Sequence, residues 1–218
     1  MFSNNGNNEK DIVRFSDIPY EVSYTGESIV AVTIYNKHEV VFVNVITNII
    51  TNTVDIVYHC YGTNFNMNRL AIRVIQQPTS SHIVYLDPKG KLIDRVNIPS
   101  ANSAHISLRD DTIKCTDWKA NTIYSYTLTG QQIWTFKDEN VLRVPEGIAL
   151  DKNRNVYVAG NETNNVVVLS PDGKNCKEIL TQSDGLNKPY SLRINIDRDE
   201  LLVCNERGPA FLFSLQYM

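Results

Sequence analysis

The sequence of 218 residues has few of the features that mark metal-binding, membrane-spanning or nucleic-acid-binding proteins. Its four cysteines are far apart, and none stands in the C-x-x-C spacing of a structural zinc site. No run of Lys or Arg exceeds two residues, and the net charge is −3, which excludes a general attraction to nucleic acid or anionic membranes. No apolar stretch approaches the roughly 18 residues that cross a bilayer.

The same scarcity bears on the cellular compartment. Cys60, Cys115, Cys176 and Cys204 are read as small buried apolar residues in a reducing environment. The first ten residues have neither the basic region nor the apolar core of a signal peptide. We therefore expect a cytoplasmic protein with no membrane association, no cofactor and no bound metal, in which the sequon at Asn161 stays unmodified.

What the chain does contain is a succession of short strands, seen best in residues 145–180. Four runs rich in Val, Ile, Leu or Tyr occupy 147–150, 156–159, 166–169 and 176–180. The breaks between them consist of Asn, Asp, Gly, Pro and Lys, the residues that form turns. A single four-stranded meander leaves both faces of its sheet uncovered and is marginally stable alone. Similar units are therefore expected elsewhere in the chain.

The meander repeats along the sequence. Segments that open an inner strand begin at Pro19, Cys60, Ser103, Pro145 and Pro189, with successive offsets of 41, 43, 42 and 44 residues. A glycine that suits a tight hairpin recurs before the fourth strand, at Gly6, Gly90, Gly130 and Gly173. A period near 42 with four strands per unit is typical of a β-propeller blade. The sequence thus predicts an all-β chain, a β-propeller with about five four-stranded blades.

The whole chain, 1–218, is predicted to form one propeller domain. The expected blades are 16–58, 59–101, 102–143, 144–187 and 188–218, and 1–15 is a partial blade or closing strand. A strand at 11–15 would pair beside residues 210–215 and close a five-bladed ring without exposed edges. The alternative is a truncated ring of six blades.

Three stretches give the chain a family resemblance: IWTFKDENVLRVPEGIALDKNRNVYVAG, VVVLSPDGKNCKEILTQSDGLNKPYSL and LLVCNERGPAFLF. They resemble the C-terminal NHL-repeat propeller of tripartite-motif-like proteins, closest to the expanded set of bivalve molluscs. The resemblance covers nearly the whole chain and is strongest from Ile83 onward. It implies a module that selects partners for a ubiquitin ligase. The RING, B-box and coiled-coil parts of that family have no counterpart in these residues.

In a propeller, the loops between second and third strands share one face with the linkers between blades. Tyr, Trp and Arg on loops held by a rigid sheet are common anchors of protein-binding surfaces. We therefore expect this face to bind a protein partner or ubiquitylation substrate and no small-molecule substrate. The predicted contact residues are Tyr35, Trp118, Lys119, Arg143, Glu146, Asn161, Lys188, Tyr190, Asn205 and Arg207. The alternative for Trp118 and Tyr190 is that they pack between blades.

RNA binding is a second possibility. The four basic residues of this face could contact phosphates, and Tyr20, Tyr61 and Tyr190 could stack on bases. Glu146, Glu162 and Glu206 argue against it.

An enzyme is a third possibility, since some propellers hold a metal in the central channel as lactonases or lyases. Of the equivalent inner-strand positions here, Glu21 and His105 are plausible channel-lining ligands. Two ligands are too few for a closed metal site, and no catalytic residue is predicted.

Overall fold

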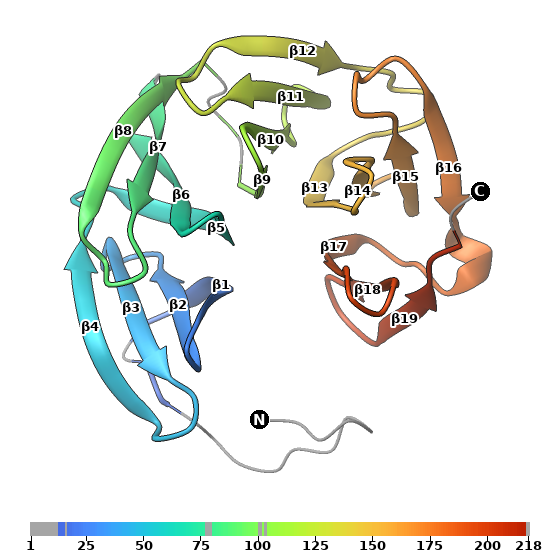
Figure 1. Ribbon diagram of the computed structural model, residues 1–218. Helices are drawn as coiled ribbons and strands as arrows, with labels where there is room; N and C mark the ends of the chain where they lie inside the picture. Colours follow the sequence, from blue (N-terminus) through green and yellow to red (C-terminus); the bar gives the residue numbers. More distant parts are fainter. Residues whose placement is uncertain (1–12, 16, 77–79, 100–101, 103, 217–218) are drawn as a thin grey trace. The chain divides into compact units, whose positions relative to one another are not determined.

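The computed structural model describes residues 13–15, 17–76, 80–99, 102 and 104–216. This part of the chain contains nineteen β-strands and one short 3-10 helix, arranged in five antiparallel sheets (Figure 1). Four sheets have four strands and the last has three. In each sheet the strands are neighbours in sequence order. The all-β class and the repeated meander predicted from the sequence are confirmed.

The described residues group into two compact units. The first comprises the residues up to Gln76 together with Ile83–Arg95, and the second comprises the short segment before Ile83 and everything from Val96 onward.

The first unit is built on two sheets, except that residues 80–82 and 96–98 of the second sheet belong to the second unit. Its core contains Ala31 and Phe42 from the first sheet with Leu70 and Val74 from the second. The strands are β1 (Pro19–Gly26), β2 (Ile29–Ile34), β3 (Glu39–Asn44) and β4 (Ile49–Asp55), then β5 (His59–Asn66), β6 (Arg69–Gln76), β7 (Ser80–Leu86) and β8 (Leu92–Ile98).

The second unit holds the three remaining sheets. The first is β9 (Ile106–Arg109), β10 (Thr112–Asp117), β11 (Thr122–Thr127) and β12 (Gln132–Phe136). The next is β13 (Pro145–Leu150), β14 (Val156–Gly160), β15 (Asn165–Leu169) and β16 (Cys176–Leu180). After the 3-10 helix η1 (Gln182–Asp184), the last sheet is β17 (Pro189–Asn195), β18 (Glu200–Asn205) and β19 (Ala210–Ser214).

The sheet β13–β16 shows how the core of the second unit is formed. Val156 and Val158 of β14 pack toward Ile123 of the preceding sheet. Tyr157 and Ala159, which alternate with them, pack toward the following sheet. Because successive side chains of a strand point to opposite faces, a sheet covered on both sides needs a continuous apolar run, and every residue of β14 is buried.

The outer strands differ from the middle ones. In β4 no residue is buried, and in β12 and β16 the residues are exposed or half-buried. The hairpin between the third and fourth strands also joins neighbouring sheets. In the second, third and fourth sheets this hairpin contains a glycine. Gly90, Gly130 and Gly173 all have positive φ, at 88, 84 and 71°. The turn glycine at Gly6 lies outside the described residues.

Each of these three glycines also touches the sheet before its own. A Cβ on Gly90 would lie 2.7 Å from Val54 Cγ2, one on Gly130 would lie 2.5 Å from the Asn97 carbonyl oxygen, and one on Gly173 would lie 2.7 Å from the Trp134 ring. Glycine is therefore required twice over, by backbone conformation and by close approach. In the first sheet the corresponding hairpin has Asn48 with φ 59° instead.

The strands expected from the sequence agree closely with those observed, but the predicted strand at 11–15 does not form over its described part. Val13, Arg14 and Phe15 are not in a strand. Val13 and Phe15 instead pack against a cluster that includes Val32 and Val41 of β2 and β3. The residues before Val13 lie outside the described part, so the closing seam stays a prediction.

A stability comparison tests the role of the hairpin glycines. We expect Gly130→Ala to lower the free energy of unfolding by about 3 kcal/mol, because it adds overpacking against Asn97 to a left-handed backbone conformation. Gly208 also has positive φ, but a Cβ added there would have no atom within 4 Å. Gly208→Ala should therefore cost only the conformational part, about 1 kcal/mol. Urea denaturation measures both; equal losses would contradict the packing role.

Candidate functional site

A β-bulge recurs where the first strand of a sheet opens. One extra residue is inserted between Pro19 and Val22 in β1, between Cys60 and Thr63 in β5, and between Pro145 and Ile148 in β13. The register of β17 shifts in the same way just after Pro189. Bulges re-aim side chains that a regular strand would direct into the sheet-to-sheet core. Three of the sequence-predicted sites lie at these bulges, namely Glu21, Glu146 and Tyr190, and His105 lies just before β9.

In the second unit the bulges bring together polar residues from three sheets. His105 Nε2 lies 3.7 Å from Glu146 Oε2, and the two side chains are only 5% and 12% exposed. The edge of the His105 ring meets the Tyr190 ring with 5.3 Å between centroids. Thr116 Oγ1 donates to the Glu146 carbonyl oxygen at 2.8 Å, which ties β10 to the start of β13. His105, Glu146 and Tyr190 are called the inner polar group below.

Burial sets the ionisation of this group. It raises the pKa of Glu146 to about 7, an effect that His105 opposes and Glu206 reinforces. The carboxyl therefore changes charge near neutral pH, whereas a solvent-exposed Glu is ionised there. A neutral Glu146 can donate a hydrogen bond, whereas an ionised one can only accept.

In the second unit, the hairpins between second and third strands and the linkers between sheets are joined by a repeated set of hydrogen bonds. The Val144 N–H donates to Asn121 Oδ1 at 2.8 Å, and the Lys188 N–H donates to Asn164 Oδ1 at 2.7 Å. In turn, the carbonyl of Val144 accepts from the Asn161 N–H, and that of Lys188 accepts from the Glu206 N–H. Each linker is thus fixed to a hairpin on either side.

These segments form one surface, the loop face, defined by residues 118–121, 143–144, 161–164, 187–188 and 205–208. Asn121, Val144, Asn164 and Lys188 all adopt positive φ, between 49 and 53°. Asn tolerates this conformation well, which explains its place at the end of two hairpins. The sequence prediction missed the part that Asn121 and Asn164 play, although their shared position in WKAN and NETN was the available signal.

The structure separates the predicted contact residues into three groups. Trp118 is 43% exposed. The Tyr190 ring contacts His105, which precedes β9 two sheets earlier in the chain, whereas the alternative placed Tyr190 between adjacent blades. Asn161 is only 8% exposed. The side-chain amide of Asn205 accepts the Asn187 N–H through its oxygen and donates to the Gly185 carbonyl through its nitrogen. These two residues therefore support the loops. The basic residues on the surface of the loop face are Lys119, Arg143, Lys188 and Arg207.

Tyr35 and Glu21 belong to the first unit. Tyr35 lies in a group of five half-buried rings, in which it stacks on His59 at 4.9 Å and meets Tyr61 edge-on at 5.2 Å. Tyr20 and His38 complete the group. Burial and the Tyr35 hydroxyl raise the pKa of Tyr61. The sequence prediction treated His38 and His59 as isolated, because nothing in their spacing shows that the hairpin at 35–38 meets the start of β5.

The Glu21 carboxylate accepts the Thr63 N–H at 2.9 Å. This bond stabilises the bulge in β5, the first strand of the next sheet, and gives Glu21 a structural role. Among the described residues, no group of three or more His, Cys, Asp or Glu side chains is placed to hold a metal ion. Within the same part of the chain, none of the helices has the length and apolar character that a bilayer crossing requires.

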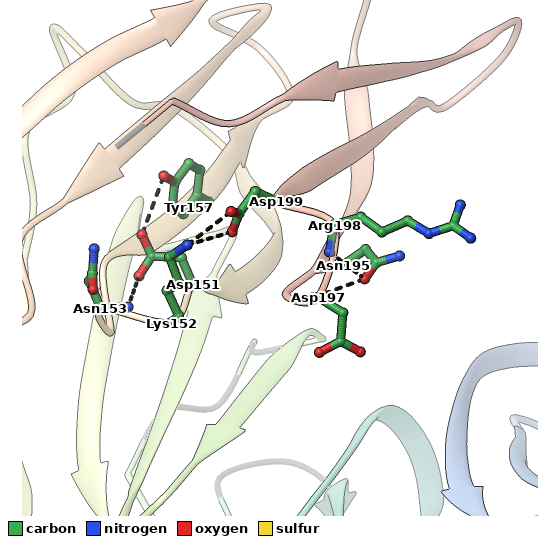
Figure 2. A network of polar contacts seen from close by, with 8 residues as sticks. All are labelled: Asp151, Lys152, Asn153, Tyr157, Asn195, Asp197, Arg198 and Asp199. Atoms are coloured by element: carbon green, nitrogen blue, oxygen red, sulfur yellow. Dashed lines mark hydrogen bonds and ion pairs between the residues drawn. The ribbon is translucent and has the colours of Figure 1, made fainter. Parts of the chain in front are cut away.

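The opposite end of the second unit carries a different kind of polar network (Figure 2). Asp151 is fully buried and accepts the N–H groups of Asn153 and Asn155, both at 2.8 Å. Lys152 bonds both carboxylate oxygens of Asp199 in the next sheet at 2.9 Å. Arg154 pairs with Asp110 in the preceding sheet at 2.8 Å. Asp151 therefore shapes a turn, as its position in the sequence indicated, and the ion pairs join neighbouring sheets.

No protein-family model matches the sequence. The E3 ubiquitin-protein ligase TRIM56 of Mus musculus is 28% identical over 102 residues, which cover 46% of this chain and 14% of that protein. TRIM56 of Homo sapiens is 27% identical over 101 residues, with coverage of 46% and 13%. The chain thus matches only a small part of the length of these relatives.

Solved structures match over a larger share. A protein of unknown function from Bacteroides caccae has a TM-score of 0.73 at 12% identity, covering 90% of this chain and 73% of that one. Virginiamycin B lyase from Staphylococcus aureus has a TM-score of 0.68 at 14% identity, covering 100% and 77%. The fold is that of a β-propeller. At these identities the likeness concerns the fold alone, and the predicted propeller class is confirmed.

The pKa of Glu146 predicts a pH dependence of stability. The pKa of Glu146 rises from the usual 4.5 to about 7 on folding. Between pH 4.5 and 7 the folded state therefore keeps a proton on Glu146 that the unfolded state has lost. Stability should therefore fall as pH rises from 5 to 8, by about 2–3 kcal/mol, and level off above. Glu146→Gln should flatten this slope and unfold at a higher temperature than the wild type at pH 8. Thermal unfolding across this range measures it; an unchanged slope would show that Glu146 is ionised throughout.

Proposed function

We propose that this chain is the partner-recognition propeller of a tripartite-motif-like protein and that it binds a protein across the loop face. The observation that carries the proposal is Trp118, a large side chain 43% exposed on a hairpin whose backbone is fixed. Asp117 accepts the N–H groups of Lys119 and Ala120, and Asn121 bonds the next linker. An exposed Trp on a preorganised loop loses little conformational entropy on binding and is a common energetic centre of an interface.

Two further points support the proposal. The NHL-like repeat and the similarity to TRIM56 agree with a module of a ubiquitin ligase. The partner would then be a ubiquitylation substrate, and the ligation chemistry would reside in RING and B-box domains outside these residues. Binding itself requires no catalytic residue in this chain, and it would take place in the cytoplasm.

A double substitution tests the binding role. Trp118→Ala with Arg143→Ala should abolish capture of the partner by the immobilised protein, while the melting temperature changes by less than about 2 °C, because both side chains are exposed. Affinity capture with quantitative mass spectrometry, wild type against variant, gives the first result, and calorimetry gives the second. Trp134→Ala is the matched control for loss of an aromatic side chain. Because Trp134 packs against Gly173, this substitution should lower stability. A large fall in melting temperature for the double variant would place its residues in the core and contradict the proposal.

The inner polar group supports a second candidate, a lyase- or lactonase-type enzyme. A buried His–Glu pair in which the carboxyl pKa is about 7 has the properties of a general acid and base. Turnover of a lactone by the purified protein, lost in His105→Ala and retained in His59→Ala, would favour this function over recognition. Absence of turnover across a panel of lactones, with and without added Mg²⁺ or Ca²⁺, would remove it.

A further inference from the structure

The basic residues of the second unit differ in whether they have partners. Among the described residues, the side chains of Lys119, Arg143, Lys188 and Arg207 make no hydrogen bond or ion pair. At the opposite end, the side chains of Lys152, Arg154 and Lys174 each pair with an Asp. The loop face thus collects four exposed cations that form no ion pair with other described residues. Arg198 at the opposite end has none either, but only Lys188 and Arg207 share a pocket, which Glu206 also lines.

Two of these cations share a pocket. Asn187, Lys188, Glu206 and Arg207 line a surface pocket of about 370 Å³, large enough for a side chain. Its walls are fixed by backbone bonds: the Glu206 N–H donates to the Lys188 carbonyl at 2.8 Å, and the Asn187 N–H donates to Asn205 Oδ1 at 3.0 Å. An ammonium and a guanidinium held at the rim of one pocket are suited to a carboxylate, which accepts charge-assisted hydrogen bonds from both.

The acidic residues of the same face decide between classes of anionic partner. Glu162 and Glu206 are exposed, and the N–H of each donates to a linker carbonyl, that of Arg143 at 3.4 Å and that of Lys188 at 2.8 Å. In the sequence, Glu162 lies between Arg143 and Lys188, and Glu206 lies between Lys188 and Arg207. A nucleic acid carries a charge at every phosphate and would be repelled at each of these positions. A polypeptide can instead place separate carboxylates opposite the cations and leave neutral residues opposite Glu162 and Glu206.

We propose that the partner presents an acidic peptide segment to the loop face, with one Asp or Glu carboxylate in the pocket between Lys188 and Arg207. A second carboxylate meets Arg143 or Lys119, and an apolar residue of the segment lies against Trp118. This inference rests on the proposed function, because it names the chemistry of the partner's binding segment. It assigns to Lys188 and Arg207 the recognition of charge and to Trp118 the apolar contact.

Selection from a library of random twelve-residue peptides displayed on phage tests the proposal on the full chain. Enriched peptides should carry at least two acidic residues. Fluorescence anisotropy with the tightest of them should show about tenfold weaker binding when its Asp and Glu become Asn and Gln, and a comparable loss with Lys188→Glu and Arg207→Glu together. Raising the salt concentration should weaken binding of the acidic peptide but not of its amide counterpart.

Arg198→Glu is the matched control, because Arg198 is also exposed but lies in the turn at the opposite end, with its side chain directed away from the network drawn there (Figure 2). This variant should bind like the wild type. Equal weakening by Arg198→Glu would show a general charge effect and overturn the proposal, as would enriched peptides without acidic residues. Tighter binding of a single-stranded RNA, lost in the same double variant, would overturn it in favour of nucleic acid.

The two proposals fail separately. If Trp118→Ala with Arg143→Ala abolishes partner capture while Lys188→Glu with Arg207→Glu leaves it intact, protein recognition stands and the acidic segment is wrong. Melting curves for the charge variants confirm that they are folded, and Lys188→Asn with Arg207→Gln, which removes charge without reversing it, should give an intermediate loss.

Discussion

The contact between neighbouring sheets is the interaction on which the rest of this structure depends. A four-stranded meander cannot bury both of its faces, so each sheet is stable only against another. In the sheet β13–β16, alternate residues of β14 serve two different cores, one on either side. The hairpin glycines add a contact at the outer rim, where any side chain would collide with the preceding sheet. Removing apolar surface from either face therefore weakens two sheets at once.

Because these contacts fix the sheets, their ends are available for different tasks. Asn and Asp shape the turns at both ends of the second unit, but the charged residues beside them behave differently. At one end Lys152 and Arg154 are bonded to carboxylates of adjacent sheets, which adds modestly to stability. At the loop face, the side chains of Lys188 and Arg207 form no ion pair with other described residues. These two cations share one pocket, which is why we assign them to binding.

Much of the fold could be predicted from the sequence, because the repeat has a period and a turn chemistry that local residues determine. The strand β16 was predicted at the observed residues, and β14 differs at its end by a single residue, Gly160. Three of the predicted turn glycines have the expected positive φ. The strand expected at 11–15 failed over Val13–Phe15, since an apolar alternation shows that a segment can be buried but not which surface buries it.

The candidate site was less predictable for the same physical reason. Position in the repeat correctly indicated that Trp118 and Arg143 stand on exposed loops, because the hairpin and linker in every repeat lie at that end. It could not show that Asn161 would be buried, that Tyr190 would pack on His105, or that Lys188 and Arg207 would share a pocket. These facts depend on side chains from different repeats, brought together by bulges that the sequence does not reveal. The ionisation of Glu146 is of this kind: the residue is ordinary in sequence, and its burial, reinforced by Glu206 and opposed by His105, raises its pKa to about 7.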